Sequence, residues 1–360
     1  MSARSCSVIV GTGSYVPPAA VRNADFARCE FYDPEGRTYD KPNEEVIALF
    51  EKITGIAERR YAAADQTASD LACRAAQNAL DASGIDKESL DYIILAHNFG
   101  DVRTAGAPSD TVPTLASRVK QRLGIMNPDA VAYDVIFGCP GWLQGMIQAD
   151  YYLKSGDARR ALVIGVDTLS RVFDPHDRDS MIYADGAGAT ILEAVASDRP
   201  LGVLSHVTRT DAARHAGLLH MGRSNKPNGD NGGAYLKMDG RAVYEYALET
   251  VPRVVKACLE KAGLTLADIH KFLLHQANAK MDEAILKRVG RLYGVRDVDS
   301  SLMPMTISWL GNSSVATVPT LLDLMVRGRL EDHRWQSGGT YVFASVGAGM
   351  NVNAMAYRCP

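Results

Sequence analysis

The chain has 360 residues, of which 46% are hydrophobic and 22% charged, and its formal net charge at pH 7 is −3. This length allows one large domain or two mid-sized domains with a substantial core. The slightly negative charge argues against general binding to nucleic acid or to anionic membranes. The start of the chain lacks the apolar region and cleavage site of a leader peptide, and no apolar run is long enough to span a bilayer.

The six cysteines are scattered along the chain and lack the C-x-x-C spacing of a zinc or redox site. They are Cys6, Cys29, Cys73, Cys139, Cys258 and Cys359. Nothing marks the chain as secreted, and it is in secreted proteins that disulfide frameworks are common. We therefore expect a soluble, cytoplasmic protein with reduced cysteines and no metal site.

Residues 79–97 show the first clear helix-and-strand pattern in the chain. Their pattern predicts a helix that ends at Gly84, a short polar connection, and an apolar strand that ends near His97. The same order of elements returns later in the chain, as described below.

Cys139 follows an apolar, strand-like stretch and a single glycine, and Pro140 comes directly after it. Proline is favoured at the first position of a helix, so the pattern places Cys139 at a strand-to-helix junction. Unpaired N–H groups and the helix dipole favour a thiolate at such a position. Cys139 is therefore a candidate nucleophile. The alternative is a buried cysteine that serves only as a small apolar side chain.

The second half of the chain repeats the first. Residues 258–275 align with residues 79–96 without a gap, and the apolar strand at 340–345 matches that at 161–166 at the same offset. Helices are expected before both of these strands, around 141–155 and 317–328. The repeat predicts a duplicated α/β domain, with one half at residues 1–195 and the other at residues 196–360.

Three polar segments of the second half are further candidates for a site. His275 ends an apolar strand, at the edge where open α/β sheets bind ligands. Asn312 lies between a glycine and small hydroxyl residues, and residues 343–350 form a strand that enters a glycine turn. Taken singly, each could be an ordinary capping, core or turn residue.

Together, Cys139, His275 in a His-Gln-Ala-Asn motif, Asn312 in Gly-Asn-Ser-Ser and the terminal Gly-x-Gly turn resemble a known family. This family is the β-ketoacyl-acyl-carrier-protein synthase III group of the thiolase fold. The resemblance begins at residues 10–17, continues through residues 54–60, 174–178 and 184–189, and ends at the Gly347–Gly349 turn. It implies two βαβαβαββ halves in a five-layered αβαβα arrangement.

The resemblance also implies the chemistry. Cys139 would accept an acyl group from a thioester, with the backbone N–H groups of Cys139 and Gly349 holding the oxyanion. The enolate of a malonyl or β-ketoacyl carrier-protein thioester, formed from the malonyl thioester by loss of carbon dioxide, would then attack the acyl group. His275 and Asn312 would stabilise the enolate as uncharged donors. No cofactor is expected beyond the acyl-CoA or acyl-carrier substrates, and a homodimer is expected.

Further residues are expected to contact these partners. The resemblance assigns contacts with coenzyme A or pantetheine to Arg171 and Asn278, and Trp142 and Phe137 beside the nucleophile are bulky. A basic strip on the helix that follows Asn278 would attract an acidic acyl-carrier protein. The strip consists of Lys280, Lys287, Arg288 and Arg291. An ordinary solvated helix face is the alternative.

The sequence departs from the family pattern near residue 50. Leu49 and Ile53 occupy the positions where the family carries the tryptophan and arginine of its coenzyme A clamp, and residues 32–42 look inserted at the pocket mouth. These changes favour an unusual acyl donor and a specialised pathway over fatty-acid initiation.

Three functions remain open at this point. The first is a condensing enzyme of the synthase III type, either a fatty-acid initiator or a specialised relative such as a dialkylresorcinol-forming ketosynthase. The second is an acyltransferase on the same fold that makes esters or amides. The third is a non-catalytic partner subunit, which the complete set of Cys139, His275 and Asn312 disfavours.

Overall fold

The computed structural model describes residues 4–227 and 233–360, and it contains two large sheets. The first sheet has the strand order β1 (Arg4–Tyr15), β7 (Asp185–Ser197), β6 (Arg160–Thr168), β4 (Tyr92–Ala96), β5 (Val131–Val135). The second has the order β8 (Gly202–Thr210), β13 (Asn351–Arg358), β12 (Thr340–Gly347), β11 (Lys271–Leu274). Pairing directions also correspond, because the first two pairs of each sheet are antiparallel and the third is parallel.

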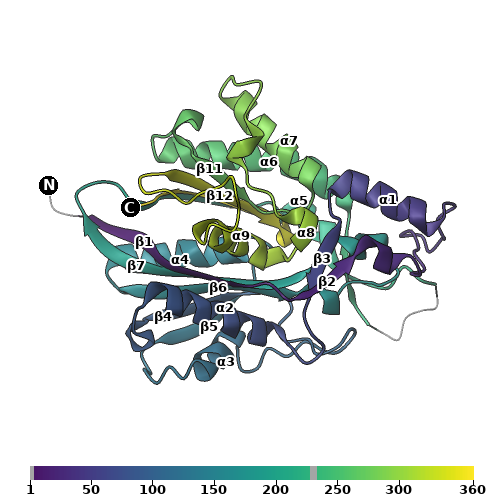
Figure 1. The fold of residues 1–360 in the computed structure, drawn as a ribbon, viewed down its shortest axis with the longest axis horizontal. Coiled ribbons are helices and arrows are strands. Elements are labelled where there is room, and N and C mark those ends of the chain that lie inside the picture. Colours follow the sequence, from purple (N-terminus) through teal and green to yellow (C-terminus); the bar gives the residue numbers. More distant parts are fainter. Residues whose placement is uncertain (1–3, 228–232) are drawn as a thin grey trace.

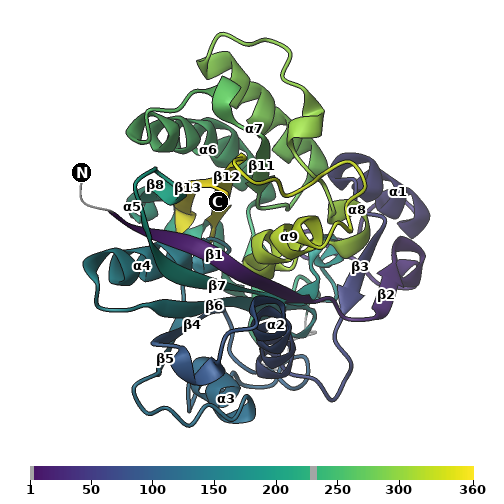
Figure 2. The same cartoon turned by 60° about the vertical axis from the view of Figure 1, so that its left-hand side comes forward.

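Helices and sheets alternate in five layers (Figure 1). The outer layers are α2 (Ala68–Ser83) with α3 (Leu115–Arg122) on the first sheet, and α6 (Gly240–Lys261) with α7 (Ala279–Leu292) on the second. Between the sheets lie α4 (Gly141–Ser155) and α9 (Thr317–Val326), which contact both of them. Figure 2 shows these two helices between the sheets from a second direction. The predicted α/β, five-layered fold is confirmed.

The repeat predicted from the sequence is visible in the local structure. Gly84 and Gly263 end their helices in the left-handed conformation, with φ of 66° and 67°, which glycine adopts without steric cost. A short 3₁₀ turn follows each glycine, at Lys87–Ser89 and at Leu266–Asp268, and then β4 or β11 begins. The predicted division at residue 195 falls near the end of β7 and stays a prediction.

The second half lacks one strand of the expected pattern within residues 233–360. The chain between α7 and α9 contains α8 (Ile307–Leu310) and 3₁₀ turns where a counterpart of β5 is expected. Here the buried Gln276 side chain accepts hydrogen bonds from the N–H groups of Thr306 and Ile307 and donates to the Pro304 carbonyl. Pro304 has no N–H group to donate to a neighbouring strand, and the bonds from the Gln276 side chain hold this segment instead.

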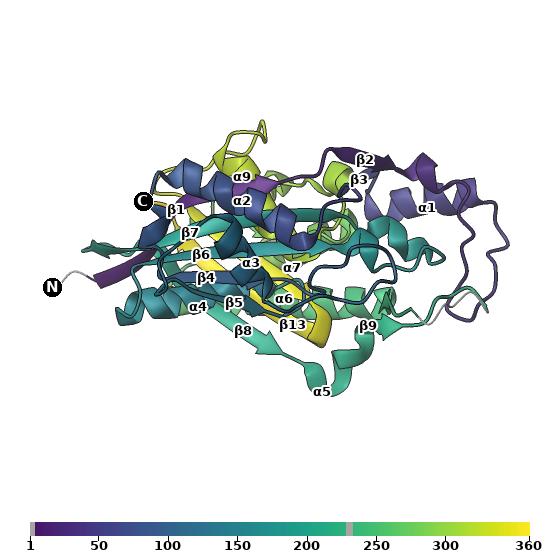
Figure 3. The ribbon, with the colours of Figure 1, turned by 90° about the horizontal axis from the view of Figure 1, so that it is seen from below.

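Smaller elements gather at the end of the molecule away from the N-terminus. They are α1 (Asn43–Thr54) and the pairs β2 (Ala19–Arg22) with β3 (Glu58–Tyr61) and β9 (Leu219–Gly222) with β10 (Tyr235–Met238). Figure 3 shows α1, β2, β3 and β9 at this end. The short helix α5 (Ala212–His215) instead follows β8 and contacts the turn at Ala348–Met350. No helix of the described residues is both long and apolar enough to cross a membrane.

Residues of the middle layer pack so closely on Gly165 in β6 that no side chain fits there. A Cβ atom there would lie 2.5 Å from the Val315 carbonyl oxygen and 2.9 Å from Cβ of Trp142. We predict that Gly165→Ala lowers the free energy of unfolding by about 1–3 kcal/mol, because a rigid, packed site must move. Urea unfolding measures this change.

Gly217→Ala is the matched control, because a Cβ at Gly217 would meet no atom within 4 Å. We expect it to change the unfolding free energy by less than about 0.5 kcal/mol. Equal stabilities of the two variants would contradict the packing seen at Gly165.

Candidate active site

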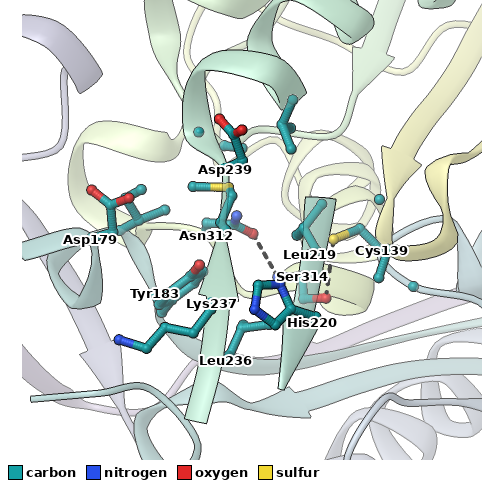
Figure 4. Close-up of a pocket in the computed structure, with 18 of the residues that line it drawn as sticks. Cys139, Asp179, Tyr183, Leu219, His220, Leu236, Lys237, Asp239, Asn312 and Ser314 are labelled. Atoms are coloured by element: carbon teal, nitrogen blue, oxygen red, sulfur yellow. Dashed lines mark hydrogen bonds between the residues drawn. The ribbon is translucent and has the colours of Figure 1, made fainter. Parts of the chain in front are cut away.

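A cavity of about 1590 Å³ lies where the two halves meet, and it is lined by residues from both. Cys139 comes from the first half, whereas His275, Asn312 and Gly349 come from the second. Figure 4 shows Cys139 and Asn312 at this cavity, with Ser314 in contact with each. The structure therefore brings together the three residues that the sequence analysis selected as catalytic, and their roles stay predictions.

Cys139 lies between β5 and α4, at the junction predicted from its neighbours. Gly138 has a φ of 66°, and α4 begins at Gly141, with Pro140 at the N-cap one residue before the helix. The glycine turn after β12 packs directly against this junction, since a Cβ at Gly347 would lie 2.5 Å from the Cys139 backbone nitrogen. Only a bare backbone fits between the two segments.

The Cys139 thiol is less acidic than its helix position suggests. Its pKa is raised to about 11, mainly by burial and also by the nearby Asp167 carboxylate, whereas a hydrogen bond from Ser314 acts in the opposite direction. The Ser314 hydroxyl donates to the sulfur over 3.4 Å. In the free protein, burial thus outweighs the helix terminus, and Cys139 holds its proton at neutral pH.

His275 follows β11 directly and is buried and uncharged. Its backbone N–H donates to the Ala344 carbonyl, which continues the parallel ladder between β11 and β12. Burial lowers the pKa of the imidazole to about 4. Neither ring nitrogen has a hydrogen-bond partner among the described residues. A neutral ring carries one N–H donor, and the lack of a protein partner leaves it for a ligand.

The carboxamide of Asn312 is held in one orientation. Its Oδ1 accepts a hydrogen bond of 2.8 Å from the backbone N–H of Ser314. Its own backbone bonds to Ile182 and Ala184, which fixes the segment beside the cavity. Because the oxygen is engaged, the amide presents its NH₂ group as the free donor. His275 and Asn312 thus offer two uncharged donors at one cavity.

The glycine turn carries the backbone donor predicted for the oxyanion. Gly349 has a φ of 77°, and Met350 adopts 48°, an uncommon value for a side chain of its size. A Cβ at Gly138 would lie 2.7 Å from the Ala348 nitrogen, so this turn and the Cys139 junction are in backbone contact. The oxyanion role of Cys139 and Gly349 stays a prediction that this contact supports.

The sequence analysis missed three polar residues next to the nucleophile. Ser314 contacts the sulfur, Asn98 donates to Ser314, and Asp167 accepts from Asn98. Asn98 follows the end of β4, as His275 follows the end of β11. Its place just after a strand of the first half, where open α/β sheets bind ligands, was the signal that could have pointed to Asn98.

Two of the four residues expected to contact the acyl thioester line the cavity. Phe137 and Asn278 do so, and Asn278 also caps α7 through a bond from the Met281 N–H. Trp142 is only 1% exposed and packs on Phe343 between the sheets. Arg171 donates to the Ala63 carbonyl. The structure thus places Trp142 and Arg171 away from the cavity wall, because both have partners within the fold.

The basic strip lies on α7 as expected. Lys280 lines the cavity, and Lys287, Arg288 and Arg291 are exposed. The apolar face of the helix is buried by Met281, Ile285 and Val289, whereas Leu292 is exposed. Arg288 also donates to the Leu248 carbonyl. The geometry permits a charged partner to approach the cavity along α7, and the docking role stays a prediction.

The region of departure from the family pattern lies at the cavity. Ile53 at the end of α1 and Pro34 in the segment 32–42 are lining residues. Asp33 holds this segment in a turn through bonds from Arg37. Arg178, which the sequence analysis did not select, lines the cavity beside Asp179.

The buried, neutral His275 makes a pH prediction possible. Its folded-state pKa of about 4 lies below the unfolded value of about 6.5, so the unfolded chain gains a proton first as the pH falls. We predict that the wild type loses about 2 kcal/mol more unfolding free energy between pH 7 and pH 4.5 than His275→Asn does. Urea unfolding at both pH values checks this.

His220→Asn provides the control, since His220 is exposed in the same cavity. It should follow the wild-type pH dependence. If His275→Asn also follows the wild type, His275 is not buried in its neutral form.

Comparisons with known proteins agree with this geometry. The family models for 3-oxoacyl-[acyl-carrier-protein] synthase III and for its C-terminal domain match residues 133–212 and 259–359. The β-ketoacyl-[acyl carrier protein] synthase III of Thermus thermophilus is 30% identical, with 98% of this chain and 99% of that chain covered and a TM-score of 0.80. The Pseudomonas aeruginosa 3-oxoacyl-(acyl carrier protein) synthase III is 29% identical over 99% and 98% of the chains, with a TM-score of 0.78.

A priming β-ketosynthase from a polyketide biosynthetic pathway is similar to the same degree. It is 28% identical, with 100% of this chain and 98% of that chain covered and a TM-score of 0.82. Two family models that together match half of the chain, and a relative at 30% identity along its length, establish the relationship. The chain belongs to the 3-oxoacyl-[acyl-carrier-protein] synthase III family of condensing enzymes.

Proposed function

We propose that this protein transfers an acyl group from a thioester to Cys139 and then condenses it with a malonyl or β-ketoacyl carrier-protein thioester. The observation that carries this proposal is the pair of uncharged donors, His275 and Asn312, in one cavity with Cys139. In a condensation, the acylated cysteine and the enolate must meet in one cavity. The two uncharged donors can hold the enolate oxygen there by hydrogen bonds, without a net positive charge.

The two half-reactions make different demands on the site. In the first, the sulfur attacks the thioester carbonyl, a tetrahedral oxyanion forms, and the carrier thiol leaves with the proton of Cys139. The backbone donors at Cys139 and Gly349 hold this oxyanion. In the second, the malonyl thioester loses carbon dioxide, and the oxygen of the resulting enolate bonds to the imidazole of His275 and the NH₂ group of Asn312. The enolate carbon then attacks the acyl carbonyl, and the Cys139 sulfur is released.

The reaction is redox-neutral, so it needs no cofactor beyond the substrate thioesters. An acyl-carrier protein supplies the second substrate and docks along α7, where Lys280, Lys287 and Arg291 are exposed beside the cavity. Leu49 and Ile53 replace an aromatic and a cationic residue of the family pattern on α1, which favours a carrier-bound donor over coenzyme A. A donor of this kind suits a specialised ketosynthase, such as a dialkylresorcinol-forming enzyme.

An acyltransferase that makes esters or amides is the second candidate, because it would also use Cys139 and His275. The fixed orientation of Asn312 favours the condensing enzyme, since an enolate gives its NH₂ group a bonding partner. Removal of the Asn312 carboxamide should slow product formation by a condensing enzyme and have little effect on an acyltransferase.

We predict that Asn312→Ala leaves acylation of Cys139 nearly intact and slows decarboxylation and condensation by roughly 10²-fold or more. The reason is that backbone groups hold the first oxyanion, whereas the carboxamide acts on the enolate. Intact-mass spectrometry after exposure to acyl-CoA and acyl-carrier thioesters measures acylation, and release of carbon dioxide from malonyl-carrier protein measures the second step.

Cys139→Ala is the negative control and should gain no acyl mass, whereas Cys73→Ala should be acylated like the wild type. Near wild-type product formation by Asn312→Ala with its true acceptor would replace the condensing enzyme by the acyltransferase. An adduct on the Cys139→Ala protein would end both.

We further propose a homodimer formed through β5. This strand is the last of its sheet, and among the described residues it pairs with β4 alone, so its other edge offers free backbone groups. Val131 and Ile136 at its ends are 48% and 68% exposed. An apolar, unpaired edge strand next to the nucleophile fits an isologous interface between two copies.

We predict a dimer at micromolar concentration by sedimentation velocity. The double substitution Val131→Lys with Ile136→Lys should dissociate it, because charges then face each other along the paired edges. Leu292→Lys on α7, where Leu292 is 39% exposed, is the control and should remain a dimer. A wild-type protein that is an active monomer would exclude this arrangement.

A further inference from the structure

The Cys139 sulfur is the end of a chain of hydrogen bonds that begins inside the first half. Asp167, at the end of β6, accepts from the backbone N–H of Asn98 at 2.9 Å and from its side-chain Nδ2 at 2.7 Å. The same Nδ2 donates to the Ser314 hydroxyl at 3.1 Å, and this hydroxyl donates to the sulfur at 3.4 Å. The chain links β4, β6, the segment before α9 and the nucleophile.

The direction of these bonds is fixed by what each group can donate. An ionised carboxylate only accepts, so the Asn98 amide must turn its NH₂ group towards Asp167. One proton of that NH₂ group then serves Asp167 and the other serves Ser314. The Ser314 hydroxyl therefore accepts from Asn98, and its single proton points to the sulfur. A thiolate accepts such a proton better than a thiol does.

The backbone at Ser314 is bent to make this contact. Its φ of 53° lies in the left-handed region, which a serine enters only at a steric cost. The Asn312 side chain holds this conformation through its bond from the Ser314 N–H. A strained backbone that presents one hydroxyl to the nucleophile points to a function for that hydroxyl.

We propose that Asp167, Asn98 and Ser314 form a directed hydrogen-bond chain that presents a proton to Cys139 and stabilises its thiolate. Ser314 acts on the sulfur itself, and Asn98 and Asp167 are positioning residues that act through it. The proposal rests on the proposed role of Cys139 as the nucleophile. It adds a local donor at the point where burial opposes ionisation of the thiol.

The other ionisable groups around Cys139 are His275 after β11, Tyr183, Asp167, and His97, which lies near Asp167. Burial lowers the pKa of His275 to about 4 and raises the pKa of Tyr183 well above its usual value. A change in the alkaline titration of Cys139 can therefore be assigned to the chain when only Ser314 or Asn98 is altered.

The test is the rate at which iodoacetamide alkylates Cys139 of the full-length protein between pH 6.5 and 10.5, followed by peptide mass spectrometry. Ser314→Ala should raise the pKa of the Cys139 thiol by about one unit, which lowers the alkylation rate throughout this pH range. At pH 8 this should slow alkylation by about threefold, since the smaller thiolate fraction is partly offset by a more nucleophilic thiolate. Asn98→Ala should act in the same direction, because the Ser314 proton is then free to turn away.

Ser314→Gly guards against misfolding, because glycine adopts the left-handed conformation without strain and also lacks the hydroxyl. It should be slowed like Ser314→Ala. Ser313→Ala is the matched control, since the Ser313 hydroxyl bonds to Thr317 instead of the sulfur. A wild-type profile for either Ser314 variant or for Asn98→Ala would overturn the proposal, as would equal slowing by Ser313→Ala. Acylation by thioesters is measured separately. The alkylation rates can therefore be interpreted even if the proposed function fails.

Discussion

The backbone contact between the Cys139 junction and the glycine turn is the constraint on which the site depends. Cys139 and Gly347 approach so closely that a Cβ on the glycine would lie 2.5 Å from the cysteine nitrogen. This contact joins the two halves at the reacting atom, because one segment follows β5 and the other follows β12. A backbone of bare glycine at this point allows N–H groups of both halves to face one small volume. His275 and Asn312 then need only extend from neighbouring segments of the second half.

Burial decides the protonation states of this site more than local charge does. It keeps the imidazole of His275 neutral, and it also opposes ionisation of the Cys139 thiol. The dry environment that suits an enolate acceptor is therefore unfavourable for the nucleophile. Hydrogen-bond donors to the sulfur reconcile the two requirements, because they favour the thiolate without adding a charge.

The fold and the central residues were accessible from the sequence because they depend on local pattern. The spacing around Gly84 and Gly263 defined the repeat, and the glycine and proline beside Cys139 defined its junction. The contact of Arg171 with the substrate was expected from the family resemblance, and that of Trp142 from its place beside the nucleophile. Trp142 instead packs on Phe343 between the sheets and Arg171 donates to the Ala63 carbonyl, and both contacts depend on tertiary packing. The contact of Ser314 with the sulfur depends on a left-handed backbone and on Asn98, which follows β4. Within residues 233–360, the replacement of the expected strand between α7 and α9 by short helices depends on the buried Gln276 side chain.

The shared middle layer has a consequence for the origin of the fold. α4 from the first half and α9 from the second form one apolar core with both sheets, in which Ile94 and Val163 join Phe343 and Tyr357. Either half alone would expose the inner face of its sheet and one helix to water. The free-energy cost of this exposure scales with the apolar area exposed. A single ancestral half would thus have required a second copy to fold. The modern chain retains that association as an internal one, and its two halves are expected to unfold together as one cooperative unit.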